Sequence, residues 1–181
     1  KIGERITAKL GLSETYELTQ YVNGFYIPSD KIVRHYDVTD FLSAVEDAAV
    51  ARDERQAENL YARAIDLYKA SFLTSITMPW AIERREQLRQ SYAQALIGMG
   101  RIAQGRNLLE HARGFFSRAL KETPEREDIH REMIRLYGMQ GMINDAIQHY
   151  QRLEQYLHKT VGIAPSLETR QTFEAVVNGR A

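Results

Sequence analysis

The sequence predicts an all-α fold of antiparallel helix pairs that stack into a superhelix, with a short β-hairpin before them. Apolar residues recur at three- and four-residue spacing from Asp37 onward, which is the periodicity of one helix face. The four prolines, which break helices, stand between these periodic segments. Shifting the sequence by 34 residues also brings landmark residues into coincidence, which indicates a repeated helix pair.

The first 36 residues predict a short helix over Glu4–Leu10 and then the hairpin. The stretch TYELTQYVNGFYI, residues 15–27, is rich in β-branched and aromatic side chains around Asn23-Gly24. A two-residue hairpin turn needs positive φ at both positions, and asparagine and glycine tolerate this best. Pro28 then closes the second arm.

The helical body begins with a pair over Val38–Ala70, and Ser71–Pro79 is an insertion before the next pair. Helix starts are marked by Asp37, by Thr123-Pro124 and by Ser166, since short polar side chains cap the first turn of a helix.

The later pairs follow one order of small, aromatic, and small or apolar side chains. The 34-residue shift superimposes Ala112 on Ala146, Phe116 on Tyr150, and Ala119 on Leu153. A small residue lets two helix backbones approach, and the aromatic one turn later fills the neighbouring groove. This pattern resembles the tetratricopeptide repeat, with units at 93–126 and 127–160.

The composition is that of a soluble globular protein, with 44% hydrophobic and 27% charged residues. The absence of cysteine excludes disulfides, thiol nucleophiles and zinc-thiolate sites, and it fits the cytoplasm, where we expect the protein. No apolar run is long enough to predict a membrane contact. The net charge of zero, from 24 basic and 24 acidic residues, disfavours binding of nucleic acid by this chain alone.

His130 and Glu132 form a His-x-Glu pair that invites comparison with zinc enzymes. The zinc deaminase signature also requires cysteines, and the zinc protease signature requires His-Glu-x-x-His, so neither is met. His130 falls on the first helix of a repeat, where a large residue packs against its neighbour. We therefore expect a packing role, and we expect no metal, cofactor or enzyme activity.

Three further passages carry a closer resemblance: residues 67–96, 123–157 and 161–174, the last reading VGIAPSLETRQTFE. They resemble the bacterial transcriptional activator domain, which follows the DNA-binding domain in SARP-type regulators. The resemblance covers roughly residues 37–178 and implies a tetratricopeptide-like regulatory domain over 37–181.

The amino-terminal segment resembles the end of an OmpR-like winged helix. ITAKLG, residues 6–11, is similar to the end of a recognition helix, and NGFYI, residues 23–27, to a wing. The resemblance implies that residues 1–36 are the C-terminal remnant of a DNA-binding domain, and that DNA is bound only through the complete upstream winged helix. The residues then closest to DNA are Arg5, Lys9, Asn23 and Gly24.

Arginines on the first helices predict a binding groove, because these helices line the concave face of a tetratricopeptide array. Arg131 and Arg135 lie one turn apart on the same side of their helix. By their position in the repeats, both and Arg101 should point into the groove, where three guanidinium groups could clamp the carboxylates of an acidic peptide. The alternative is a solvated helix face on which Glu127 pairs with Arg131.

Two further features have structural interpretations. We expect Trp80 to fix the insertion onto the first repeat, as aromatic side chains commonly do in cores, and the charged run 83–86 to be a solvated helix face.

The predicted function is that of a regulatory protein–protein interaction and oligomerisation domain in a bacterial DNA-binding transcriptional activator. Its partners would be its own dimer mate, an effector domain or RNA polymerase. The alternative is a general tetratricopeptide scaffold or adaptor that binds an acidic peptide in its concave groove.

Overall fold

The computed structural model describes residues 8–9, 11, 19–30 and 36–179 of the 181. The chain divides into two units, Lys1–Tyr36 and Asp37–Ala181. Of the predicted helix over Glu4–Leu10, only residues 8 and 9 are described, and they are helical; the rest lies outside the described residues. No helix in the described part combines the length and apolar character that a membrane crossing requires.

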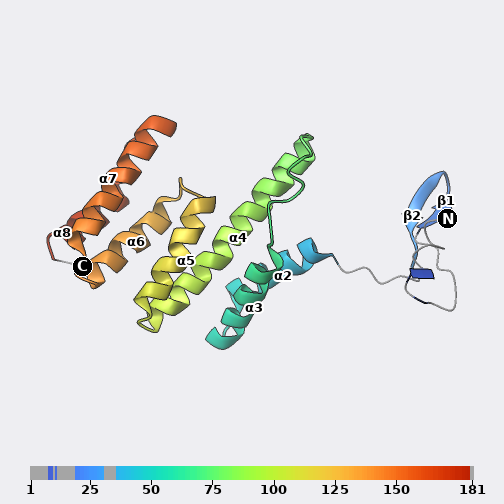
Figure 1. The fold of residues 1–181 in the computed structure, drawn as a ribbon, viewed down its shortest axis with the longest axis horizontal. Coiled ribbons are helices and arrows are strands. Elements are labelled where there is room, and N and C mark those ends of the chain that lie inside the picture. The colour runs from blue at the N-terminus through green and yellow to red at the C-terminus, as the bar shows by residue number, and fades with distance from the viewer. Residues whose placement is uncertain (1–7, 10, 12–18, 31–35, 180–181) are drawn as a thin grey trace. The chain divides into compact units, whose positions relative to one another are not determined.

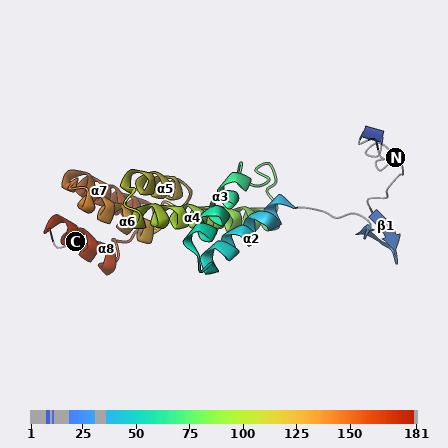
Figure 2. The same ribbon diagram turned by 90° about the horizontal axis from the view of Figure 1, so that it is seen from below.

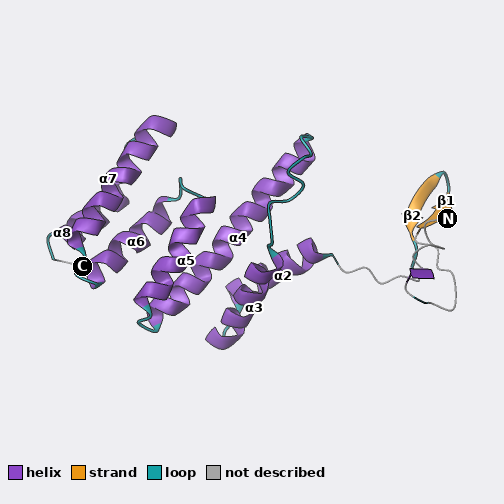
Figure 3. Ribbon diagram, viewed as in Figure 1, coloured by secondary structure: helices purple, strands orange, loops and turns teal. Residues whose placement is uncertain are grey.

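The first unit contains the predicted hairpin. Strands β1 (Thr19–Val22) and β2 (Phe25–Pro28) pair antiparallel, with Val22 opposite Phe25 (Figure 3). Asn23 and Gly24 between them have φ of 51° and 88°, as a two-residue turn with a right-handed strand twist requires.

The second unit is helical throughout and consists of helix pairs laid side by side (Figures 1 and 2). Helix α2 packs on α3, α4 on α5, and α6 on α7, while α8 contacts both α6 and α7. The helices are α2 (Asp37–Val50), α3 (Glu54–Leu67), α4 (Pro79–Gly105), α5 (Leu109–Glu122), α6 (Glu127–Met139), α7 (Ile143–Thr160) and α8 (Leu167–Val177). The predicted fold class is confirmed.

Local signals explain some of the helix boundaries. The Ser166 side chain caps α8 by accepting from Thr169 N, as predicted. Thr123 differs from the prediction, because it ends α5 and does not start α6: its Oγ1 donates to Ala119 O at 3.0 Å, and α6 begins only at Glu127. The unit expected to start near residue 93 also starts earlier, at Pro79, since proline suits the first helical position and no further proline follows until Pro124.

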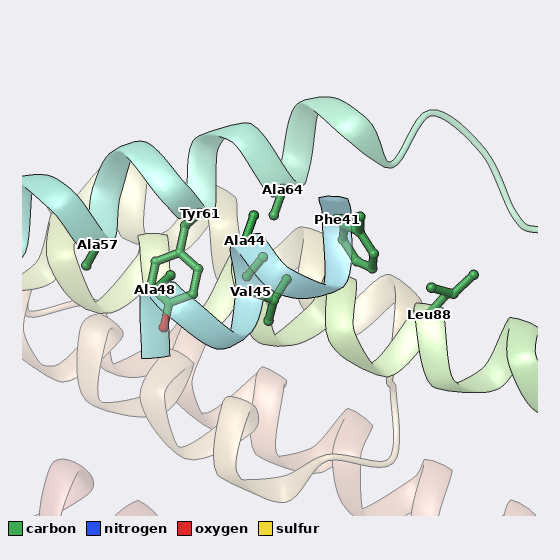
Figure 4. Close-up of a cluster of buried hydrophobic side chains, with 9 residues drawn as sticks. Phe41, Ala44, Val45, Ala48, Ala57, Tyr61, Ala64 and Leu88 are labelled. Atoms are coloured by element: carbon green, nitrogen blue, oxygen red, sulfur yellow. The ribbon is translucent and has the colours of Figure 1, made fainter. Parts of the chain in front are cut away.

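The core of the described residues consists of three clusters that follow one another along the helix array. The first joins α2, α3 and α4, and Figure 4 shows Tyr61 of α3 among the small residues of α2. The second joins α4, α5 and α6, and the third joins α6, α7 and α8. Each repeat therefore buries its apolar face against the next, as in other repeat proteins.

The small–aromatic order of the repeats is visible in this packing. All six residues superimposed by the 34-residue shift are buried, from 0% exposure at Phe116 to 9% at Tyr150. A Cβ added at Gly98 would lie 2.3 Å from the Tyr61 ring, and one at Gly100 would lie 2.5 Å from the Phe116 ring. These glycines let each aromatic ring of a second helix lie directly on the backbone of α4.

The insertion between α3 and α4 is held by an arginine and not by Trp80. The Trp80 side chain is 52% exposed, so the prediction that it fixes the loop in the core is wrong. Arg85, predicted to lie on a solvated face, donates to Phe72 O at 2.8 Å, Leu73 O at 2.6 Å and Ile76 O at 2.9 Å. One guanidinium thus donates hydrogen bonds to three carbonyl groups of a segment that forms neither a helix nor a strand.

Candidate partner-binding groove

The three arginines predicted to face the groove lie on the first helices of their repeats. Arg101 is on α4, and Arg131 and Arg135 are on α6. Their guanidinium groups have different surroundings, and this difference decides which of them is open to a partner.

Arg131 is engaged within the chain. Its guanidinium donates to Thr169 Oγ1 at 3.0 Å and forms an ion pair with Glu168 Oε2 at 3.1 Å. Both acceptors belong to α8, and the Arg131 side chain is only 14% exposed. In this conformation Arg131 fastens the last helix and is not presented to a partner.

Glu127 completes this junction at the start of α8. Its Oε2 accepts hydrogen bonds from Ser166 N at 2.9 Å and from Ser166 Oγ at 2.8 Å. Burial opposes ionisation of Glu127, but hydrogen bonds from Thr169 and Ser166, together with the charge of Arg131, outweigh it and lower the pKa of Glu127. Glu127 is therefore a stabilised anion that joins α6 to α8.

Arg135 is open. Its side chain is 42% exposed, and its ion pair with Glu132 is a single contact of 3.5 Å. Within the described residues its guanidinium makes no hydrogen bond. A guanidinium carries five N–H donors in a planar fork, so Arg135 can still bind a carboxylate with two parallel bonds.

Arg135 lines a groove of about 450 Å³ between three helices. Gln104 comes from α4, Arg135 and Met139 from α6, and Ala175 and Val176 from α8. Helices α6 and α8 approach closely beside the lining residue Val176, since a Cβ on Gly138 of α6 would lie 2.9 Å from its side chain. The groove is thus a shallow apolar site with one open cation.

Arg101 is exposed on α4, three residues before Gln104. Among the described residues its side chain makes no hydrogen bond or ion pair. Of the three predicted arginines, Arg135 and Arg101 are therefore available, and Arg131 is occupied.

His130 lies in a buried pair that the sequence did not reveal. His130 Nε2 is 3.0 Å from Pro124 O, and His130 Nδ1 is 2.8 Å from His149 Nε2. A carbonyl only accepts, so His130 Nε2 donates to it; in the neutral ring Nδ1 then accepts from His149 Nε2. Both rings are 9% exposed, which agrees with the predicted packing role of His130.

The surroundings keep this pair neutral. Burial lowers the pKa of His130 despite its hydrogen bond to Pro124. Burial, followed by the charges of His130 and Arg152, lowers the pKa of His149 to about 3. In the part of the chain that the structure describes, no group of three or more His, Cys, Asp or Glu side chains is arranged to hold a metal.

The residues predicted to lie near DNA fall in the first unit. Asn23 and Gly24 form the exposed turn of the hairpin, and Lys9 is exposed in the helical residues 8 and 9. Arg5 lies outside the described residues. The hairpin carries three strongly exposed aromatic rings, Tyr21 at 66%, Phe25 at 72% and Tyr26 at 77%.

Sequence reasoning missed the partners of Arg131 and His130. His149 lies 19 residues from His130, and Thr169 lies 38 residues from Arg131, so neither pair shares a helix or a repeat spacing. One available signal was Ser166-Leu-Glu-Thr after Pro165, which marks a helix start with polar groups clustered in its first turn.

Comparison with known proteins identifies a family and solved structures with a similar fold. The sequence profile of the family described as "Bacterial transcriptional activator domain" matches residues 36–177. No curated protein matches the sequence. Mycobacterium tuberculosis EmbR, solved in complex with a low-affinity phosphopeptide, superimposes with a TM-score of 0.69 at 17% identity. That match covers 91% of this chain and 44% of the EmbR chain, so this chain spans less than half of that protein.

The second fold is the C-terminal TPR-containing domain of a Plasmodium falciparum protein described as FK506-binding. It superimposes with a TM-score of 0.56 at 13% identity, over 78% of this chain and 89% of that one. At such identities both likenesses concern the fold alone, and they bear out its tetratricopeptide-like character.

Proposed function

The chain belongs to the bacterial transcriptional activator domain family, and we propose that it is the regulatory protein-contact and oligomerisation domain of a DNA-binding transcriptional activator. The observation that carries this proposal is the family match over 36–177, which confirms the resemblance seen in the sequence. The family is a regulator domain and not an enzyme class.

The fold supports a contact role. Stacked helix pairs offer an extended surface and present side chains from several helices to one partner. EmbR, which has a similar fold, was solved with a phosphopeptide, so a chain containing this fold engages a peptide partner. The partners proposed for this chain are its own dimer mate, an effector domain of the same regulator, or RNA polymerase.

The hairpin supports the DNA-binding part of the proposal. A wing is a hairpin with a tight turn, and β1 and β2 with Asn23-Gly24 have that form. We propose that residues 1–36 belong to a winged helix and that DNA is bound by the complete domain. The net charge of zero argues against DNA binding by this chain on its own.

Fluorescence anisotropy with duplex DNA tests this function. The chain is compared, at low and at physiological salt, with a version extended upstream by about 70 residues, which restores the usual size of a small domain. The expected result is salt-dependent, sequence-selective binding by the extended version alone. If the extended version also fails to bind at low salt, the regulator proposal is wrong.

The second candidate function is a scaffold or adaptor that binds an acidic peptide. The observation that favours it is the groove at Arg135, with Arg101 exposed on the neighbouring first helix. It requires no DNA-binding domain, so DNA binding by the extended version would separate the two candidates.

A further inference from the structure

The groove between α4, α6 and α8 has a mainly apolar lining. Val176 is 2% exposed and packs against α6, and its neighbour Ala175 is half-buried. Met139 is 56% exposed, which is unusual for a large apolar side chain next to a core. Methionine is flexible and polarizable and adapts to different apolar guests. An acidic peptide without an apolar side chain would leave this surface uncovered.

Arg135, the open cation, is one of the residues that line this groove. A carboxylate that reaches Arg135 displaces only the single 3.5 Å contact with Glu132. Arg131 does not compete, because its side chain is only 14% exposed and is engaged by Glu168 and Thr169. Arg135 is therefore the group that recognises an incoming anion. Arg101 lies one repeat earlier, on α4.

The same surroundings argue against a polyanion. Glu132 flanks Arg135, and the exposed carboxylate of Glu168 lies on the groove wall. These two charges repel a run of phosphates such as a nucleic-acid backbone, whereas one carboxylate can be placed on Arg135 without approaching both. A single anionic group next to an apolar one fits the charge pattern.

Two amides suit a peptide backbone. Gln104 makes only a weak 3.9 Å contact from Nε2 to Met139 Sδ, so its Oε1 can accept, and Gln171 is exposed on α8. A side-chain amide donates and accepts at once, as does each peptide unit of an extended chain. The volume of about 450 Å³ is within the range of sites that hold a small ligand or a few side chains.

We propose that this groove binds a short extended peptide segment of a protein partner, in which a large apolar side chain lies within two residues of an aspartate or glutamate. The apolar side chain packs on Met139, Ala175 and Val176, and the carboxylate pairs with Arg135. The inference rests on the proposed function, because it specifies the partner chemistry of a protein-contact domain.

A random heptapeptide library displayed on phage and selected on the immobilised chain tests the proposal without assuming a partner. The expected result is enrichment of peptides that carry an apolar residue within two positions of Asp or Glu. The enriched peptides are then synthesised with a fluorescent label and titrated against the chain and its variants. No enrichment over a coated surface without the protein would overturn the proposal.

Matched variants locate the site. Arg135→Gln removes the cation and Met139→Gln removes the apolar contact, and each is expected to weaken binding at least tenfold, a loss of about 1.4 kcal/mol. The controls make the same changes elsewhere: Arg52→Gln on an exposed loop, and Met78→Gln, whose native methionine is 57% exposed. They should leave binding within twofold. Equal binding by all four variants would show that the peptides bind elsewhere and would refute the groove assignment.

The two proposals fail in different ways. If the extended chain does not bind DNA but the library yields groove-dependent peptides, the regulator function is wrong and the groove stands as the site of a scaffold. If DNA binding is found and the library yields nothing, the regulator function stands and the groove assignment is wrong.

Discussion

The Nδ1 atom of His130 lies 2.8 Å from the Nε2 atom of His149, so a hydrogen bond between two buried imidazoles joins α6 to α7. The arrangement needs one lone pair and one proton at this contact. Protonation of either neutral ring would place a charge in a site that burial keeps neutral. The stability of the helical unit should therefore depend on pH.

We expect the free energy of unfolding to fall as the pH decreases from about 7 to about 5. His149 has a pKa of about 3 in the folded chain, whereas an exposed histidine has an ordinary pKa of 6.5, so the unfolded state binds more protons in this window. His149 alone contributes a loss of about 2 kcal/mol. Carboxyl groups titrate mostly below about pH 5, so they add little to the change in unfolding free energy over this range.

Urea unfolding followed by circular dichroism at several pH values measures this dependence. His149→Gln removes the titrating group and should flatten the dependence, whereas His158→Gln, which changes an exposed histidine of the same helix, should leave it unchanged. A His149→Gln variant with the same slope as the native chain would contradict the assignment.

The contact of Gly100 with Phe116 predicts an unusual response to alanine. A Cβ at Gly100 would lie 2.5 Å from the Phe116 ring, so Gly100→Ala must displace a fully buried aromatic side chain. We expect a destabilisation of about 1–3 kcal/mol, as is typical of overpacked cores. Gly114→Ala is the control, because Gly114 is an exposed helical residue with open space around it. There alanine should stabilise by about 0.5–1 kcal/mol. Thermal unfolding that gave both changes the same sign would disprove the close packing.

The loop before α4 should depend on Arg85. Arg85→Ala leaves three carbonyls of the loop without their donor, and hydrogen bonds to a charged group are each worth about 1.5–3 kcal/mol. Because the loop can rehydrate, we expect only about 1–3 kcal/mol of destabilisation but much faster cleavage within residues 69–78 in limited proteolysis. Arg84→Ala, which removes only a bond to Gln87, should not change the cleavage rate. Unchanged proteolysis of Arg85→Ala would show that the loop has another anchor.

Arg131 and Arg135 should separate a structural role from a binding role. Arg131→Ala removes the contacts to Thr169 and Glu168, so we expect faster amide hydrogen exchange in α8 and a loss of about 1–3 kcal/mol. Arg135→Ala removes one long, exposed contact and should change stability by less than about 0.5 kcal/mol. Equal exchange in α8 for the two variants would mean that Arg131 does not fasten that helix.

Local features of the chain were predictable from the sequence because they depend on residues close together in it. The Asn23-Gly24 turn follows from the φ values that these residues tolerate. The helix pairs follow from apolar spacing, and the order of Ala112, Phe116 and Ala119 follows from what two packed helices need. The packing role of His130 could be inferred from its position in a repeat. The family was recognisable from three continuous passages, residues 67–96, 123–157 and 161–174.

The tertiary structure alone decided how polar side chains are paired between helices. His149 becomes the partner of His130, α8 captures Arg131 while Arg135 stays open, and Arg85 holds a loop that Trp80 was expected to hold. These contacts join residues that lie up to 38 positions apart. An arginine on a helix face has the same sequence pattern whether solvent or a later helix covers it. Only the packing of α8 against α6 distinguishes the buried anchor from the open cation, because that packing determines which guanidinium is removed from water.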